Sequence, residues 1–147
     1  MAGRNPAVRS PSASPTQLKG FHMLGYCILG TNDLNTATAF YDEILALFGA
    51  RQVMEHDRGV FYGVDTLALG LLMPANGKEA AVGNGSMVAL QASSRQQVDE
   101  VYAKALTLGG AGEGEPGVRG PDPDGFYGAY FRDREGNKLC VYHFGMK

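Results

Sequence analysis

The chain has little of what marks secreted, membrane-spanning or nucleic-acid-binding proteins. It holds two cysteines in 147 residues, Cys27 and Cys140, with no CxxC pair, which favours a reducing compartment. The formal net charge of −2 offers no basic surplus for a phosphate backbone. Its longest apolar stretches, such as residues 66–74, are far shorter than the roughly 20 residues that cross a bilayer. We therefore predict a cytoplasmic protein whose partner is a small molecule, not a nucleic acid or a membrane.

Residues 1–22 differ in composition from the rest of the chain. They are rich in Ser, Pro and Ala, and they contain no acidic residue and no periodic apolar pattern. Such a segment cannot bury enough apolar surface to fold alone. It also lacks the continuous apolar region of a secretory signal and a convincing amphipathic stripe. We expect a disordered tail or an expression leader, followed by a single domain over residues 23–147.

The first half of this domain predicts one strand, one helix and three further strands. An apolar run over residues 23–30 ends at a Thr-Asn-Asp turn, as expected for a buried strand. Apolar residues from Ala37 to Phe48 recur at three- and four-residue spacing, which predicts a helix that Gly49 ends. The three following strands are expected at residues 51–56, 59–64 and 67–73.

The same order begins again after residues 74–85, a connection rich in Gly with Pro and Asn. A strand is expected at residues 86–92, and then a helix at 95–108 with Ser93 or Ser94 as its N-cap. The Gly- and Pro-rich residues 112–125 predict a loop, and residues 133–137 predict a turn. Two strands are expected on either side of that turn, at residues 126–132 and 138–144.

A shift of the chain on itself by 61 residues aligns the two halves without a gap. Tyr26 then falls on Met87, which makes the two opening strands equivalent. Identities gather in the helix and its end, where Tyr41 falls on Tyr102, Leu45 on Leu106, Leu47 on Leu108, Gly49 on Gly110 and Ala50 on Ala111. Duplication explains this clustering, and it predicts an α+β fold of two βαβββ modules, residues 23–74 and 86–147. We expect mixed curled sheets, with one helix covering the outer face of each.

Three segments carry a resemblance to the vicinal oxygen chelate superfamily, which includes glyoxalases, bleomycin-resistance proteins and extradiol dioxygenases. They are Gly30-Thr31-Asn32-Asp33-Leu34 leading to Phe40-Tyr41, Val98-Asp99-Glu100-Val101-Tyr102 leading to Gly109-Gly110, and Tyr130 to Leu139. The resemblance covers the chain from Met23 to the C-terminus. It implies that each module curls its sheet into half of a cleft, which holds a small molecule or a divalent metal.

The resemblance also implies metal ligands, usually His or Glu, on the first and last strands of each module. The matching positions in this chain are Tyr26, Leu71, Met87 and Cys140. This set lacks the charge and hardness of the usual magnesium, nickel, zinc or iron sites. We therefore expect a cleft without a metal or another cofactor.

Further residues are assigned to the ligand-binding cleft on their chemistry. Tyr130 and Tyr142, with Tyr26, would give an aromatic lining with hydroxyl groups, although core packing explains them equally well. Arg119 is the predicted anion contact, and a plain solvated arginine is its alternative. Cys140 has no histidine placed to form a thiolate, so we predict no catalytic residue.

Three functions are compatible with these features. The first is a glyoxalase- or bleomycin-resistance-like protein that binds a small organic molecule without a metal. The second is a lyase or dioxygenase whose metal is held by other residues, for which His56 and Glu55 are available. The third is an interaction module whose cleft is filled by its own side chains. A homodimer is expected in each case, because members of this superfamily often pair and two-fold dimers are the commonest oligomers.

Overall fold

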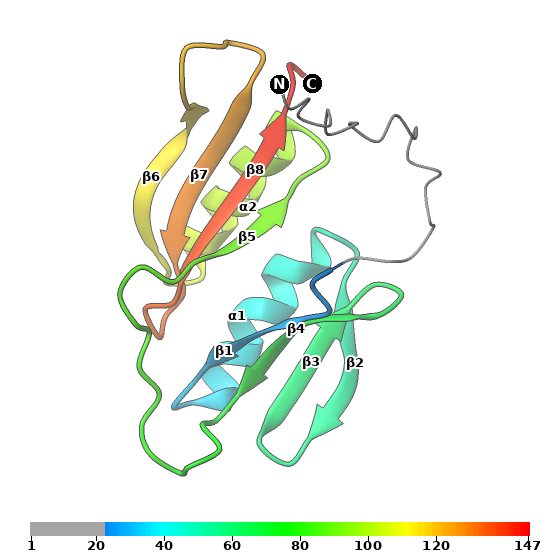
Figure 1. Ribbon diagram of the computed structural model, residues 1–147, viewed down its shortest axis with the longest axis vertical. Helices are drawn as coiled ribbons and strands as arrows, with labels where there is room; N and C mark the ends of the chain where they lie inside the picture. The colour runs from blue at the N-terminus through cyan, green and yellow to red at the C-terminus, as the bar shows by residue number, and fades with distance from the viewer. Residues whose placement is uncertain (1–22) are drawn as a thin grey trace, which may run out of the picture.

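The computed structural model describes residues 23–147, which form two modules with the same order of elements (Figure 1). The tail predicted at residues 1–22 lies outside this range. No helix among the described residues is long and apolar enough to span a membrane.

Module 1 contains one helix and a four-stranded mixed sheet, sheet A. Its strand order is β1-β4-β3-β2, in which β1 and β4 are parallel and the other pairs are antiparallel. The elements are β1 (Cys27–Gly30), α1 (Leu34–Ala46), β2 (Arg51–His56), β3 (Gly59–Gly63) and β4 (Leu67–Leu72).

Module 2 repeats this topology in sheet B, whose strand order is β5-β8-β7-β6 with β5 parallel to β8. This arrangement confirms the predicted α+β fold of two βαβββ modules. The elements are β5 (Val88–Gln91), α2 (Arg95–Thr107), β6 (Ala111–Val118), β7 (Phe126–Arg132) and β8 (Lys138–Phe144).

The two helices begin at equivalent points of the repeat. Leu34 and Arg95 lie 61 residues apart, and each helix is 13 residues long. The preceding side chains cap them in the same way: Asp33 accepts a hydrogen bond from the Thr36 backbone N–H and Ser94 from that of Gln97. The shift found in the sequence is therefore a structural repeat.

Strand β6 shows that the loop predicted at residues 112–125 was wrong for residues 112–118, whereas residues 119–125 contain no helix or strand. Its glycines and Pro116 have low strand propensity, which explains why sequence patterning missed it. It survives as an edge strand because β7 supplies its hydrogen bonds on one side, and two irregularities in the pairing accommodate the unusual composition.

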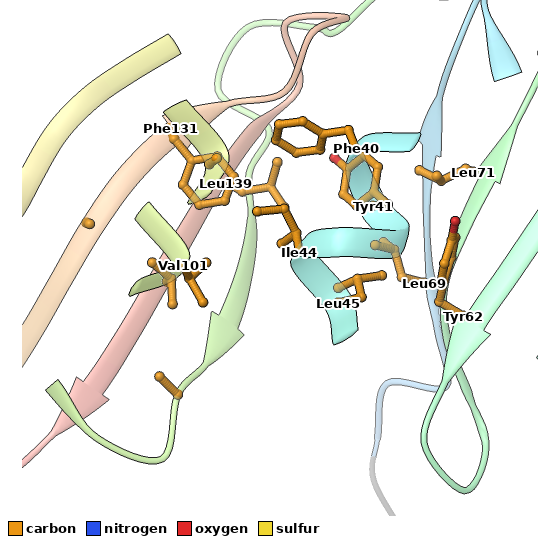
Figure 2. Packing of buried hydrophobic residues seen from close by; sticks show 14 of the residues in the cluster. Phe40, Tyr41, Ile44, Leu45, Tyr62, Leu69, Leu71, Val101, Phe131 and Leu139 are labelled. Atoms are coloured by element: carbon orange, nitrogen blue, oxygen red, sulfur yellow. The ribbon is translucent and has the colours of Figure 1, made fainter. Parts of the chain in front are cut away.

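Both modules share one hydrophobic core, and α1 lies at its centre. Figure 2 shows Ile44 pointing toward Phe131 and Leu139 of module 2, while Leu45 on the same helix points toward Leu69 of module 1. Since α1 and α2 contact each other as well as their own sheets, the helices lie between the two sheets, and not on outer faces as predicted from the sequence. The opposite face of each sheet, here called its helix-free face, carries no helix.

A turn between β7 and β8 also joins the modules. Buried Asp133 accepts a hydrogen bond from the Tyr41 hydroxyl at 2.7 Å, and Asn137 donates through Nδ2 to the Gly30 carbonyl at 3.0 Å. Glu135 accepts from Thr31 at 3.2 Å. The turn therefore has a structural role, as its composition of Asp, Gly and Asn indicates.

Candidate functional site

Strand alternation places a set of chemically distinct side chains on the helix-free face of sheet B. Phe131, Leu139 and Val141 point into the core, so the alternate residues of β7 and β8 point the other way. Tyr130 lies directly opposite Cys140 in the antiparallel pairing, and Tyr142 follows two residues later on the same face. Three of the predicted cleft residues are thus brought together.

Two cationic side chains flank the Tyr130 ring. The Arg119 guanidinium carbon lies 5.6 Å from the ring centroid, and the Lys138 ammonium nitrogen lies 5.5 Å from it. Lys138 extends from β8, whereas Arg119 follows β6, so the cations approach from the two strands beside β7. Both distances fit cation–π contacts, and both side chains are half-buried.

Two glycines of β6 make room for Arg119. A Cβ atom on Gly117 would lie 3.0 Å from the Arg119 Nη1 atom, and one on Gly114 would lie 3.4 Å from Nη2 and 3.0 Å from the Tyr130 ring. The guanidinium donates from Nη2 to the Glu115 carbonyl at 2.7 Å. The bare backbone of β6 therefore lets Arg119 fold back over the sheet instead of extending into solvent.

Cys140 lies beneath these groups and is 1% exposed. Burial raises the pKa of its thiol, while a hydrogen bond with Tyr130 and the charges of Arg119 and Lys138 act in the opposite direction. The net effect is a raised pKa, so the group is a protonated thiol at neutral pH. A buried, protonated thiol of this kind suits packing beneath the Tyr130 ring better than nucleophilic attack.

Aromatic rings continue the same face toward the end of β8. Phe126 stacks on Tyr142 with 5.3 Å between centroids and 10° between planes, and Phe144 meets both rings edge-on. Gly128 permits this stack, because a Cβ atom there would overlap the Phe126 ring. The face therefore has a cationic part around Tyr130 and an aromatic part around Tyr142.

Met87 lies where the modules meet, between two hollows that share Lys138. One, of about 230 Å³, also contacts Ile28 of module 1, and the other, of about 280 Å³, contacts Arg132. A further hollow, of about 520 Å³, lies beside the linker on module 1 and is lined by none of the predicted residues.

Tyr26 and Leu71 do not join this group. Tyr26 lies on module 1, edge-on to Phe61 at 5.4 Å. Leu71 is 1% exposed and packs in the core near Tyr41 (Figure 2). The strand register instead matches Gly70 with Cys140. Gly70 pairs with Ile28 in sheet A, Cys140 pairs with Ala89 in sheet B, and Ile28 and Ala89 are equivalent in the 61-residue repeat. A shift of one residue along a strand reverses the face to which a side chain points.

The residues at the family's metal positions do not fit a divalent ion. On the structural register they are Tyr26, Gly70, Met87 and Cys140, and glycine provides no side-chain ligand. Among residues 23–147, no group of three His, Cys, Asp or Glu side chains is arranged to hold a metal. His56 accepts the Arg58 backbone N–H at 3.1 Å through Nδ1, in a turn on module 1.

The sequence model of the Glyoxalase/Bleomycin resistance protein/Dioxygenase superfamily matches residues 23–141. The chain belongs to this superfamily. A glyoxalase/bleomycin resistance protein from Albidiferax ferrireducens is 36% identical in sequence, and the match covers 83% of this chain and 98% of that one with a TM-score of 0.75.

Two other similar solved structures carry functional names. A lactoylglutathione lyase from Agrobacterium tumefaciens is 27% identical with a TM-score of 0.55, over 82% of this chain and 92% of that one. The fosfomycin resistance protein FosX from Listeria monocytogenes is 20% identical with a TM-score of 0.60, over 84% and 93%, and this likeness concerns the fold. No functionally curated protein matched the chain.

Three residues that lie on the helix-free face of sheet B were not assigned from the sequence. Lys138 and Phe144 follow the same two-residue period as Cys140 and Tyr142, so strict alternation along β8 would have found them. Phe126 required knowledge of the pairing with β8, which places it beside Phe144.

Proposed function

We propose that the protein binds a small organic molecule on the helix-free face of sheet B without using a metal. The observation that carries this proposal is the cluster of Arg119, Lys138 and Tyr130 beside an aromatic stack, on a sheet face that no helix covers. Binding sites typically combine an apolar surface with a few placed polar groups, and this face has both.

Each part of the face has a distinct role in this proposal. Tyr142, with its aromatic neighbours, gives a flat apolar surface for the body of the ligand. Tyr130 and Arg119 supply the polar contacts that orient it. The exposed Met87 packs against it as a soft, polarisable group, and the buried Cys140 supports the Tyr130 ring from beneath. No residue is assigned a catalytic role.

We also propose that two copies pair as a homodimer. Both helix-free faces expose large apolar side chains: Tyr26 is 53% exposed and Ile28 50% on sheet A, and Phe144 is 63% exposed on sheet B. Apolar surface of this kind marks an interaction site. In a two-fold dimer the sheet A face of each copy would cover the sheet B face of the other. Both ligand-binding faces would then be enclosed. Light scattering coupled to size-exclusion chromatography tests this, and a monomeric mass at micromolar concentration would exclude it.

The cytoplasm is the proposed compartment, since both cysteines are free thiols. A reducing environment keeps them in that state.

Metal content and ligand binding should be measured together on protein purified without a histidine tag. We expect less than stoichiometric metal by elemental analysis, together with thermal stabilisation by members of a panel of aromatic and thiol-conjugated molecules in the presence of a chelator. The Tyr142→Ala variant should lose that stabilisation, whereas Tyr102→Phe on α2, which lies away from this face, should keep it.

The same experiment separates the alternatives. One equivalent of a divalent ion per chain, with stabilisation by that ion, would contradict the proposal and favour a lyase or dioxygenase with an unusual metal site. No stabilisation by any organic molecule would favour an interaction module.

A further inference from the structure

We infer that the ligand is an amphipathic organic anion, whose oxyanion head contacts Arg119 and Lys138 beside the Tyr130 ring and whose flat apolar body lies on the rings of Phe126, Tyr142 and Phe144. This inference rests on the proposed function and adds the chemical class of the ligand and its orientation.

The first support is the absence of an internal counter-ion. Within residues 23–147, ion pairs join Lys104 to Glu43 and Arg132 to Glu113, but no carboxylate lies within 4.0 Å of Arg119 or Lys138. The segment 1–22 contains no Asp or Glu that could supply one. Partly buried cations that have no ion pair of their own are available to an external anion.

Arg132 provides an internal comparison. It lies on the same face of sheet B, and its guanidinium contacts Glu113 at 2.6 Å and the Gly136 carbonyl at 2.9 Å. Arg119, by contrast, donates to one backbone carbonyl, which leaves most of its N–H groups available. The fold therefore neutralises Arg132 directly. Lys138 feels the Glu113 carboxylate only at longer range, and neither Lys138 nor Arg119 has an ion pair of its own.

The second support is that Arg119 is held in place. Gly114 and Gly117 leave the space it occupies, and its own backbone N–H donates to the Phe126 carbonyl at 2.8 Å. A guanidinium fixed on a sheet face, with donors available, suits a planar oxyanion such as a carboxylate.

The third support is the spacing along β8, where Lys138 lies at one end of the face and the rings of Tyr142 and Phe144 lie at the other. Strand residues rise about 3.3 Å each, so Tyr142 lies roughly 7 Å beyond Cys140 and roughly 13 Å beyond Lys138. A ligand whose charged head and aromatic ring are about 7 to 13 Å apart would contact both parts of the face at once.

The test compares 6-phenylhexanoate with its neutral analogue 6-phenylhexanamide, by NMR titration of the full-length protein in the millimolar range. We expect the anion to bind about tenfold more tightly than the amide, because a charge-assisted contact contributes roughly that factor. Arg119→Gln and Lys138→Gln should each bring the carboxylate close to the affinity of the amide and leave binding of the amide unchanged. Arg51→Gln, an exposed arginine on β2, is the matched control and should change neither affinity.

The outcomes separate this inference from the proposed function. Equal affinity for carboxylate and amide, unaffected by either glutamine variant but weakened by Phe144→Ala, would overturn the anionic ligand and keep a binding site on this face. Binding of neither probe would overturn the inferred ligand class, and the absence of thermal stabilisation by every molecule of the panel would overturn the proposed function as well. Melting temperatures of the variants within a few degrees of the parent would establish that any loss of affinity is local.

Discussion

Removing the Tyr41 hydroxyl tests whether the Asp133 turn holds the two modules together. Tyr41 is fully buried on α1, and its hydroxyl donates to the Asp133 Oδ2 atom at 2.7 Å across the module boundary. Burial, followed by the charge of Asp133, raises the pKa of Tyr41 well above its ordinary value, so the hydroxyl remains a donor. The Tyr41→Phe variant removes this bond and keeps the ring in the core.

The expected loss can be worked from the remaining contacts of Asp133. Its Oδ1 atom keeps the backbone N–H groups of Gly136 and Asn137, at 2.9 and 2.8 Å, and Oδ2 keeps the Asn137 side chain at 3.0 Å. The carboxylate therefore keeps three hydrogen-bond donors. The loss in unfolding free energy should resemble that of one hydrogen bond to a charged group, about 2 kcal/mol. For a domain of this size that corresponds to a melting temperature lower by roughly 4 to 8 °C.

Urea and thermal unfolding followed by circular dichroism measure this loss. Tyr102→Phe is the matched control, because Tyr102 occupies the equivalent position of the repeat on α2 and makes no such bond to a carboxylate; its stability should change by less than about 0.5 kcal/mol. Equal unfolding free energies for the two variants would refute the idea that this bond joins the modules.

Three further predictions follow from local contacts. The raised pKa of Tyr41 means that the folded state favours the protonated phenol. The stability that this hydroxyl contributes is therefore complete below about pH 10 and is lost as the pH rises above that value. The unfolding free energy of Tyr41→Phe should fall less steeply with pH than that of the parent, as measured by denaturant titrations between about pH 9 and 11. Asp33→Ala should lower the unfolding free energy by about 1 kcal/mol and Asp33→Asn by less, since only the former removes the cap of α1; equal losses in denaturant titrations would contradict this. Gly117→Val should displace Arg119 and weaken binding of an organic carboxylate about as much as Arg119→Gln does, and an unchanged affinity by NMR would show that the guanidinium does not need that space.

The repeat illustrates how far sequence patterns reached in this protein. A constant shift of 61 residues located both helices and their caps, because helical periodicity and capping depend on neighbours within a few residues. Alternation along the last strand placed Cys140 and Tyr142 on one face for the same reason.

The offset between equivalent residues of the two modules is larger in the last strands than in the first ones. Only the pairing of the strands reveals this difference. Cys27 matches Val88 at 61 residues, whereas Leu69 matches Leu139 at 70, because the second module has a longer path between its helix and its last strand. The sequence comparison chose Leu71 as the equivalent of Cys140, and the hydrogen-bonded register chooses Gly70.

The sequence by itself determined the fold class, the two modules, the helices and the chemistry available on the last strand, since these depend on local periodicity and composition. Tertiary structure decided which face each residue joins, that the glycine-rich segment becomes β6, and that Arg119 and Lys138 meet at Tyr130. Those outcomes depend on hydrogen bonds and packing between segments far apart in the chain, where one residue of register or one absent Cβ atom changes the result.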